Sequence, residues 1–151
     1  MPILFQNLLI GHILLGLAGI VFSVLVLVGF FKREAKPRFL KKTSLAAFLL
    51  YLASWVAGGY YYVEYYGNNV KPLIKAGAYP FAHGIFMEAK EHIFLFIPIL
   101  AGVIFIASWL LGDKINQEPK IKIALTVLAF VVVFLGVLIT AVGMLISGSV
   151  K

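Results

Sequence analysis

The stretch LLIGHILLGLAGIVFSVLVLVGFF, residues 8–31, decides the fold class. It contains no Asp, Glu, Lys or Arg, and a helix needs roughly 20 apolar residues to cross the hydrocarbon core of a bilayer. Three more long apolar stretches follow, at residues 44–66, 93–111 and 121–146. Their apolar residues run continuously instead of alternating, which favours helices over a membrane β-barrel. The sequence therefore predicts an all-α integral membrane protein with four transmembrane helices.

The composition supports this prediction and limits the chemistry. The chain has 151 residues, of which 62% are hydrophobic and 13% are charged, whereas about a quarter of the residues of soluble globular domains are charged. Four spans leave only short connections, so we expect a single four-helix transmembrane domain over residues 1–151. The chain has no cysteine, which excludes disulfides, thiol catalysis and cysteine-ligated metals.

The basic residues predict the orientation in the membrane. The net charge is +7, and most basic side chains lie in the first and third connections, with only Lys71 and Lys75 in the second. Positively charged loops stay in the cytoplasm, so we expect an up-down-up-down bundle in the plasma membrane with both termini on the extracytoplasmic side. The charge is thus explained by topology and contact with anionic lipid rather than by binding of nucleic acid. The residues concerned are Lys32, Arg33, Lys36, Arg38, Lys41, Lys42, Lys114, Lys120 and Lys122.

Helix breakers set the expected boundaries. Pro37 lies in the first connection and would stop a continuing helix. The run Gly67-Asn68-Asn69 is expected to end the second helix, and Pro98 falls inside the third, where it leaves a kink or an unpaired carbonyl. The predicted spans are therefore about 8–31, 44–66, 82–111 and 121–146.

Four polar residues are expected at one depth near the extracytoplasmic surface. His12 lies 19 residues before Phe31, and His92 lies 19 before Leu111, which places each roughly 28–30 Å from the cytoplasmic boundary. The same count along the second and fourth spans reaches Glu64 and Thr140, and Met144 lies one turn further out.

Small residues indicate which faces of the helices point inward. Gly16 and Gly19 follow His12 at helical spacing, and Gly136 and Thr140 lie on a comparable stripe of the fourth span. Small residues mark helix contacts in membranes because they allow backbones to approach, and they also leave room beside a flat cofactor. We therefore expect His12 to point into the bundle.

Two inward histidines at one depth favour a b-type haem. His12 and His92 would be its axial ligands, Lys90 would pair with a propionate, and Glu64 would orient a ligand imidazole or accept a proton. His83 is interpreted as a surface histidine. The function this predicts is that of a membrane cytochrome transferring electrons near the extracytoplasmic face, to or from a quinone or another redox protein. The substitutes, should either axial ligand be misassigned, are Met144, Met87 and His83.

Two other interpretations remain open. The first is a membrane-embedded site for zinc, iron or manganese, although the Glu-x-x-His pattern of ferritin-like sites is absent. The second is a non-catalytic small subunit of a larger complex, or a homodimer. A hydrolase is disfavoured because Asp113, the sole aspartate, is expected opposite every histidine; no catalytic residue is assigned. The donors of the metal site would come from His12, His92, Glu64, Glu88, Glu91 and His83.

Overall fold

The computed structural model describes residues 1–149, and all of their regular secondary structure is helical. Four continuous helical stretches are long and apolar enough to cross a membrane, as predicted. The first is α1 (Ile3–Phe31), and the fourth is α6 (Pro119–Gly148). The second, Pro37–Ala76, comprises α2 (Pro37–Tyr61), the π-helix η1 (Tyr62–Val70) and α3 (Lys71–Ala76). The third, Ala82–Leu111, comprises the π-helix η2 (Ala82–Met87) and α4 (Glu88–Leu111), and the short helix α5 (Lys114–Gln117) precedes α6.

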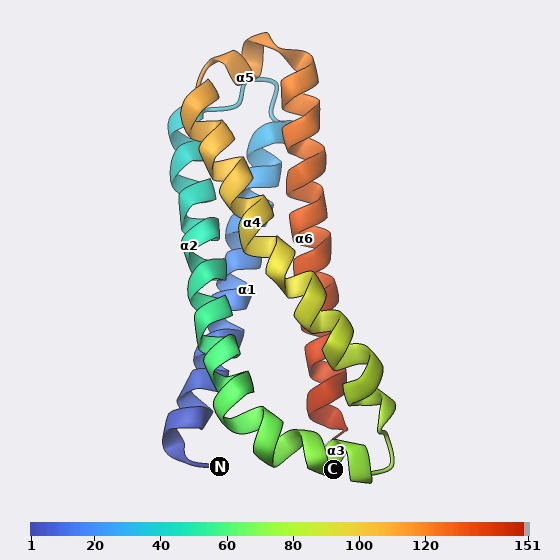
Figure 1. Ribbon diagram of the computed structural model, residues 1–151. Helices are drawn as coiled ribbons and strands as arrows, with labels where there is room; N and C mark the ends of the chain where they lie inside the picture. Colours follow the sequence, from blue (N-terminus) through green and yellow to red (C-terminus); the bar gives the residue numbers. More distant parts are fainter. Residues whose placement is uncertain (150–151) are drawn as a thin grey trace.

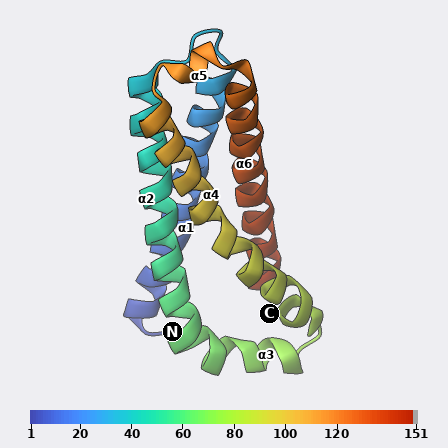
Figure 2. The same ribbon diagram turned by 45° about the horizontal axis from the view of Figure 1, so that its top comes forward.

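The long helices form a bundle in which α1 and α4 are diagonal. Helix α1 packs against α2 and α6, and α4 packs against the same two helices. The start of α1 and the end of α6 lie at one end of the molecule, and α5 lies at the other (Figure 1). Toward the end that holds the termini, α4 leans away from α2, and η1 and α3 run across the interval between them (Figure 2).

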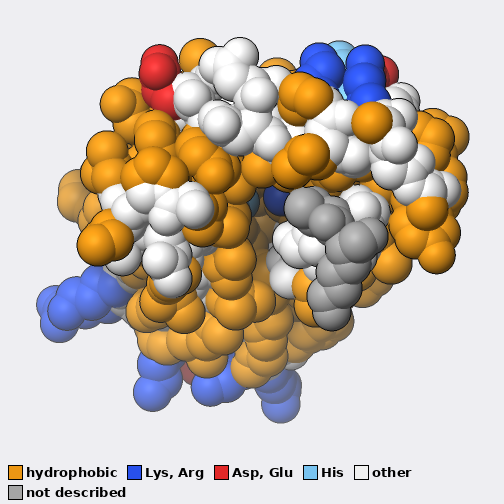
Figure 3. Space-filling model, turned by 90° about the horizontal axis from the view of Figure 1, so that it is seen from below, with side chains coloured by type: hydrophobic (Ala, Val, Ile, Leu, Met, Phe, Trp, Pro, Cys, Tyr) orange, Lys and Arg blue, Asp and Glu red, His pale blue; other side chains and the backbone are white. Residues whose placement is uncertain are grey.

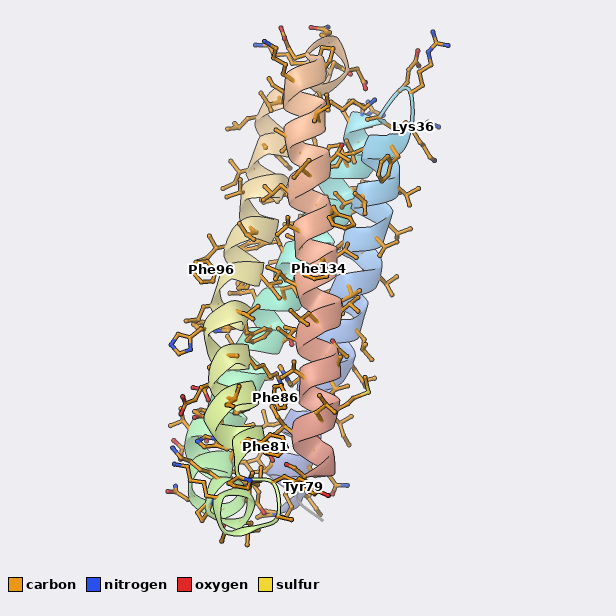
Figure 4. The ribbon with its side chains drawn as sticks, turned by 90° about the vertical axis from the view of Figure 1, so that its right-hand side faces the viewer. Lys36, Tyr79, Phe81, Phe86, Phe96 and Phe134 are labelled. Atoms are coloured by element: carbon orange, nitrogen blue, oxygen red, sulfur yellow. The ribbon has the colours of Figure 1, made fainter. Side chains whose placement is uncertain are left out.

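The outer surface of the bundle is apolar along its length. In an apolar 18-residue window of each span, only 28–33% of the residues are buried inside the protein. Phe96 and Phe134 lie on the outside at mid-height (Figure 4) and are 59% and 56% exposed. An exposed apolar surface of this extent is typical of helices that cross a membrane. The core is a narrow column that includes Leu40, Tyr51 and Ile97.

The end that carries α5 is fastened by hydrogen bonds between its two connections. The amide oxygen Oδ1 of Asn116 accepts a bond from the backbone N–H of Ala35 at 2.9 Å, and its Nδ2 donates to the Ala35 carbonyl at 2.9 Å. Lys122 Nζ donates to the carbonyls of Lys32 and Arg33 at 2.6 and 2.9 Å. These bonds tie the first connection to α5 and α6. We call this the basic end and the opposite one the open end.

The helix boundaries differ from those predicted at two breakers. Pro37 does not lie in a loop but begins α2, because a proline at the first helical position needs no N–H partner. The run Gly67-Asn68-Asn69 does not end the helix, because the backbone continues through it in π-helical turns. The chain reverses at residues 77–81 instead. Pro98 lies inside α4 as predicted, and its missing N–H deprives the Phe94 carbonyl of a helical donor.

Candidate ligand-binding pocket

A two-chambered pocket occupies the half of the bundle near the open end. The large chamber has a volume of about 580 Å³ and is lined by α1, α2, η1, α4 and α6. The small chamber, about 370 Å³, lies between α1 and α6 with contributions from α2 and α4. Figure 3 views the molecule from the open end and shows an opening among hydrophobic side chains, with a basic group inside it. Six residues line both chambers and form the boundary between them: Leu9, His12, Lys90, Phe94, Gly143 and Ser147.

His12 is held at this boundary by α2. Its Nδ1 lies 2.9 Å from the carbonyl oxygen of Ser54 and 3.0 Å from the Ser54 hydroxyl, and that hydroxyl donates to the His12 carbonyl at 2.9 Å. A carbonyl oxygen only accepts hydrogen bonds, so Nδ1 carries a proton and donates. Nε2 of the neutral ring is then a free acceptor on the side of the pocket. The close approach of the ring to α2 depends on Gly58, where a Cβ would lie 2.5 Å from Nδ1.

Lys90 and Glu91 bring opposite charges to the same pocket. Lys90 reaches α6, where a Cβ built on Gly143 would lie 3.2 Å from its Nζ, and its side chain lines both chambers. Glu91 lines the large chamber, and its Oε1 is buried without a hydrogen-bond partner among the described residues. An apolar cavity that contains unpartnered polar groups is typical of a ligand site.

The structure does not bring His12 and His92 together. His92 is exposed on the outer surface of α4, and its Nδ1 lies 2.7 Å from the Glu88 carbonyl of its own helix. The ring that meets His12 across the bundle is Phe94, edge to face, with centroids 5.6 Å apart. The expected pairing of two imidazoles across the centre is therefore wrong for this arrangement, because the inward face of α4 passes through Phe94.

The glycines predicted to leave room for a cofactor are packed against neighbouring side chains, and the nearest atom to a Cβ on Gly136 would be Ile20 Cγ1 at 2.9 Å. A Cβ on Gly19 would lie 2.8 Å from the Tyr51 ring, and one on Gly136 would lie 3.2 Å from its hydroxyl. Gly16 faces Ser54 Oγ at 3.3 Å. Gly16 and Gly136 also line the small chamber, so they combine helix packing with access to the pocket.

His83 is not a surface histidine, contrary to the sequence prediction. It is 1% exposed, and its Nδ1 lies 3.1 Å from the hydroxyl of Tyr66, which is also buried. Its Nε2 is buried and has no partner within residues 1–149. The turn at residues 77–81 folds η2 back against α3 and α6, which removes this side chain from the surface and brings it to Tyr66 of η1.

The other predicted site residues are scattered. Glu64 and Glu88 are exposed and do not line the pocket. Thr140 and Met144 line the small chamber, although the Thr140 hydroxyl donates to the Gly136 carbonyl of its own helix at 2.8 Å. Nowhere in residues 1–149 do three His, Asp or Glu side chains come close enough to hold one metal ion. The donor set of the metal hypothesis is thus not assembled in this structure.

The inward face of the third span is identified by burial in the structure, and counting residues along the helix could not supply it. Running back from Ser108, a stripe of positions three or four residues apart is buried or half-buried throughout. Such a stripe is the face that a helix turns toward its neighbours, and it passes through Lys90 and His83 but not His92. Its members are His83, Met87, Lys90, Phe94, Ile97, Ala101, Ile104 and Ser108.

Comparison of the chain with protein-family models, curated proteins and solved structures finds no match.

Proposed function

We propose that this chain is a multi-pass plasma-membrane protein that binds a lipophilic redox carrier of the quinone class in the two-chambered pocket. The observation that supports this most directly is the position of His12 and Lys90. Both lie on the boundary between two largely apolar chambers, and Nε2 of His12 is the ring nitrogen that the bonds to Ser54 leave as an acceptor. A ligand with polar atoms at one end and hydrocarbon at the other satisfies both conditions.

The charges in the pocket favour a neutral head group. Lys90 contributes a positive charge and Glu91 a negative one, so the pocket is balanced before any ligand enters. A fatty acid or phospholipid would pair with Lys90 but would bring its negative charge toward Glu91, and like charges repel strongly in a low-dielectric site. A neutral ring with oxygen substituents avoids this cost and can accept a hydrogen bond from Lys90.

The shape of the pocket suits a ring attached to an apolar chain. Trp55, Tyr62 and Phe94 supply flat side chains around the large chamber, and such side chains stack on planar rings. The small chamber is lined by aliphatic side chains such as Leu17 and Ile139, and its outer edge is exposed on the apolar surface. A hydrocarbon tail leaving through that edge would enter the surrounding lipid.

The distribution of charge supports an orientation for this function. The basic end carries nine Lys and Arg residues in segments 32–42 and 114–122 and would face the cytoplasm by the positive-inside rule. The pocket then lies in the extracytoplasmic half of the bilayer, with the termini on that side in an up-down-up-down arrangement.

Tryptophan fluorescence tests the proposal because one of the two tryptophans lines the large chamber and the other lies near the basic end. Trp55 lines the large chamber, whereas Trp109 packs against Phe105 and Lys41 near the basic end. In lipid nanodiscs, short-chain ubiquinone and menaquinone analogues should quench the W109F variant saturably, and Lys90→Met should weaken that binding at least tenfold. In the matched W55F variant the remaining fluorophore is Trp109, which does not line either chamber, so its quenching measures the analogue that is dissolved in the lipid. Equal and unsaturable quenching of both variants would refute the proposal.

A haem b protein is the second candidate, and one observation favours it. Histidines that ligate metals through Nε2 commonly donate from Nδ1 to a backbone carbonyl, which fixes the ring and raises its basicity. His12 has this bond to Ser54. Under this hypothesis His12 would be the single histidine ligand, and Lys90 would pair with a propionate.

A visible spectrum separates the two candidates. Protein purified from cells supplied with a haem precursor should show a Soret band that His12→Ala abolishes and His92→Ala leaves unchanged if haem is bound. A colourless preparation from which organic solvent extracts a quinone would exclude haem and support the first candidate.

A further inference from the structure

We infer that Lys90 is an attachment site for apolar aldehydes, which its amine binds covalently and reversibly as a Schiff base. This inference goes beyond the proposed function and does not depend on it, because it concerns the reactivity of the amine and not the recognition of a quinone. It rests on three features of the pocket: the position of the amine, the apolar chambers on either side of it, and the acceptor nitrogen of His12.

The amine of Lys90 lies inside the bundle. A lysine near the end of a membrane helix usually extends its side chain toward water. Lys90 instead extends from α4 to α6, where a Cβ on Gly143 would lie 3.2 Å from Nζ and 3.8 Å from Cε. The residue is half-buried, and among residues 1–149 it is the one Lys or Arg that lines either chamber. The pocket therefore contains a single amine.

These surroundings suit the formation of a Schiff base. A lysine amine forms a carbon–nitrogen double bond with a carbonyl compound, and lysines that do so in enzymes commonly lie in hydrophobic pockets. An aldehyde group is neutral, like the head group that the charges of the pocket favour. A hydrocarbon chain attached to it would occupy the apolar chambers, whose lining includes Leu9, Phe94 and Ile139.

His12 would carry the proton that the reaction moves. Its Nδ1 donates to the Ser54 carbonyl at 2.9 Å, which leaves Nε2 as an acceptor at the boundary where Lys90 also lies. Nε2 takes one proton from the Lys90 ammonium, and the neutral amine attacks the aldehyde carbon to give a carbinolamine. The imidazolium returns that proton to the carbinolamine hydroxyl, which leaves as water. A C=N double bond thus replaces the C=O double bond, the positive charge stays on Nζ, and no electrons are transferred.

Reductive trapping tests the inference on the full chain in phosphatidylcholine nanodiscs, whose lipid has no primary amine. The protein is incubated with hexadecanal, the imine is reduced with sodium cyanoborohydride, and the modified lysines are located by peptide mass spectrometry. We expect Lys90 to carry at least ten times as much label as Lys75, which is exposed and outside the pocket. Lys90→Arg keeps the positive charge but cannot form an imine, so it should lose the label. His12→Gln should slow the labelling of Lys90 at least tenfold.

The outcomes that contradict the inference are distinct. A label spread over all lysines according to their exposure, or absent from Lys90, would overturn it. That result is obtained with the unaltered protein, so it decides the question even if Lys90→Arg does not fold. An unchanged rate of labelling in His12→Gln would overturn the role assigned to His12. Because the probe is not a quinone, these results are independent of whether quinone analogues bind.

Discussion

Replacing Gly58 with alanine tests the geometry that positions His12. A Cβ at this position would lie 2.5 Å from Nδ1, 2.7 Å from Cε1 and 3.0 Å from Cγ of the His12 ring. Contacts this short do not occur, so the ring must move away from α2 and lose its bonds to Ser54. The neighbouring Gly59 provides a matched control, because a Cβ there meets nothing within 4 Å.

The expected magnitude is the sum of three contributions. Overpacking costs about 1–3 kcal/mol, and each lost hydrogen bond costs about 1 kcal/mol. Both glycine replacements gain about 1 kcal/mol of helix propensity, which cancels when the two variants are compared. Gly58→Ala should therefore be less stable than Gly59→Ala by about 3–5 kcal/mol, which is the overpacking cost plus the two ring bonds to Ser54.

Unfolding by SDS titration in mixed micelles measures the difference directly. Gly58→Ala should also weaken ligand binding in the Trp55 assay, because it displaces the His12 ring. In a His12→Ala background the Gly58 replacement should cost almost nothing, since the two residues are in contact and their effects are not additive. Equal stabilities of the two glycine variants, with equal ligand affinities, would refute the position assigned to the His12 ring.

Two further predictions concern stability. Asn116→Ala should lower the free energy of unfolding by about 1–3 kcal/mol, because it removes both bonds to the first connection; Gln117→Ala, one residue on and exposed, should change it by less than about 0.5 kcal/mol. Gly19→Ala should destabilise by about 1–3 kcal/mol, since its Cβ would lie 2.8 Å from a buried ring, whereas Gly11→Ala, with nothing within 4 Å, should be neutral or stabilising. The same SDS titration checks both, and a Gly11 variant as unstable as the Gly19 variant would contradict the packing described for α1.

The number and order of the long helices could be predicted from hydropathy, because apolar length is a property of sequence alone. The ends of α2 could not. Pro37 acts as a breaker inside a helix but is well accommodated at its first position. The helix continues through Gly67 because η1 has π-helical hydrogen bonds. Tertiary packing stabilises that conformation, and no local signal in the sequence reports it.

The inward position of His12 could be predicted from its small-residue stripe, and the structure places its ring on the pocket. The expectation for His92 failed because a depth estimate gives height along a helix but not direction around it. The burial stripe of α4 supplies that direction and selects Lys90. The partner of His12 could not have been anticipated, since the Ser54 carbonyl is a backbone group that any residue would provide.

The hydrogen bonds of Asn116 and Lys122 at the basic end affect where a ligand can enter and leave the pocket. The basic end is restrained by four such bonds, whereas the described side-chain bond between η1 and η2 at the opposite end is the one between Tyr66 and His83. We therefore expect the lower-cost separation of the helices to be a divergence of α4 from α2 at that end, next to the large chamber. Entry and departure of a lipid-borne molecule are then governed by motions around η1 and η2. A weakened fastening would shorten the lifetime of the folded protein while leaving the residence time of the ligand nearly unaltered.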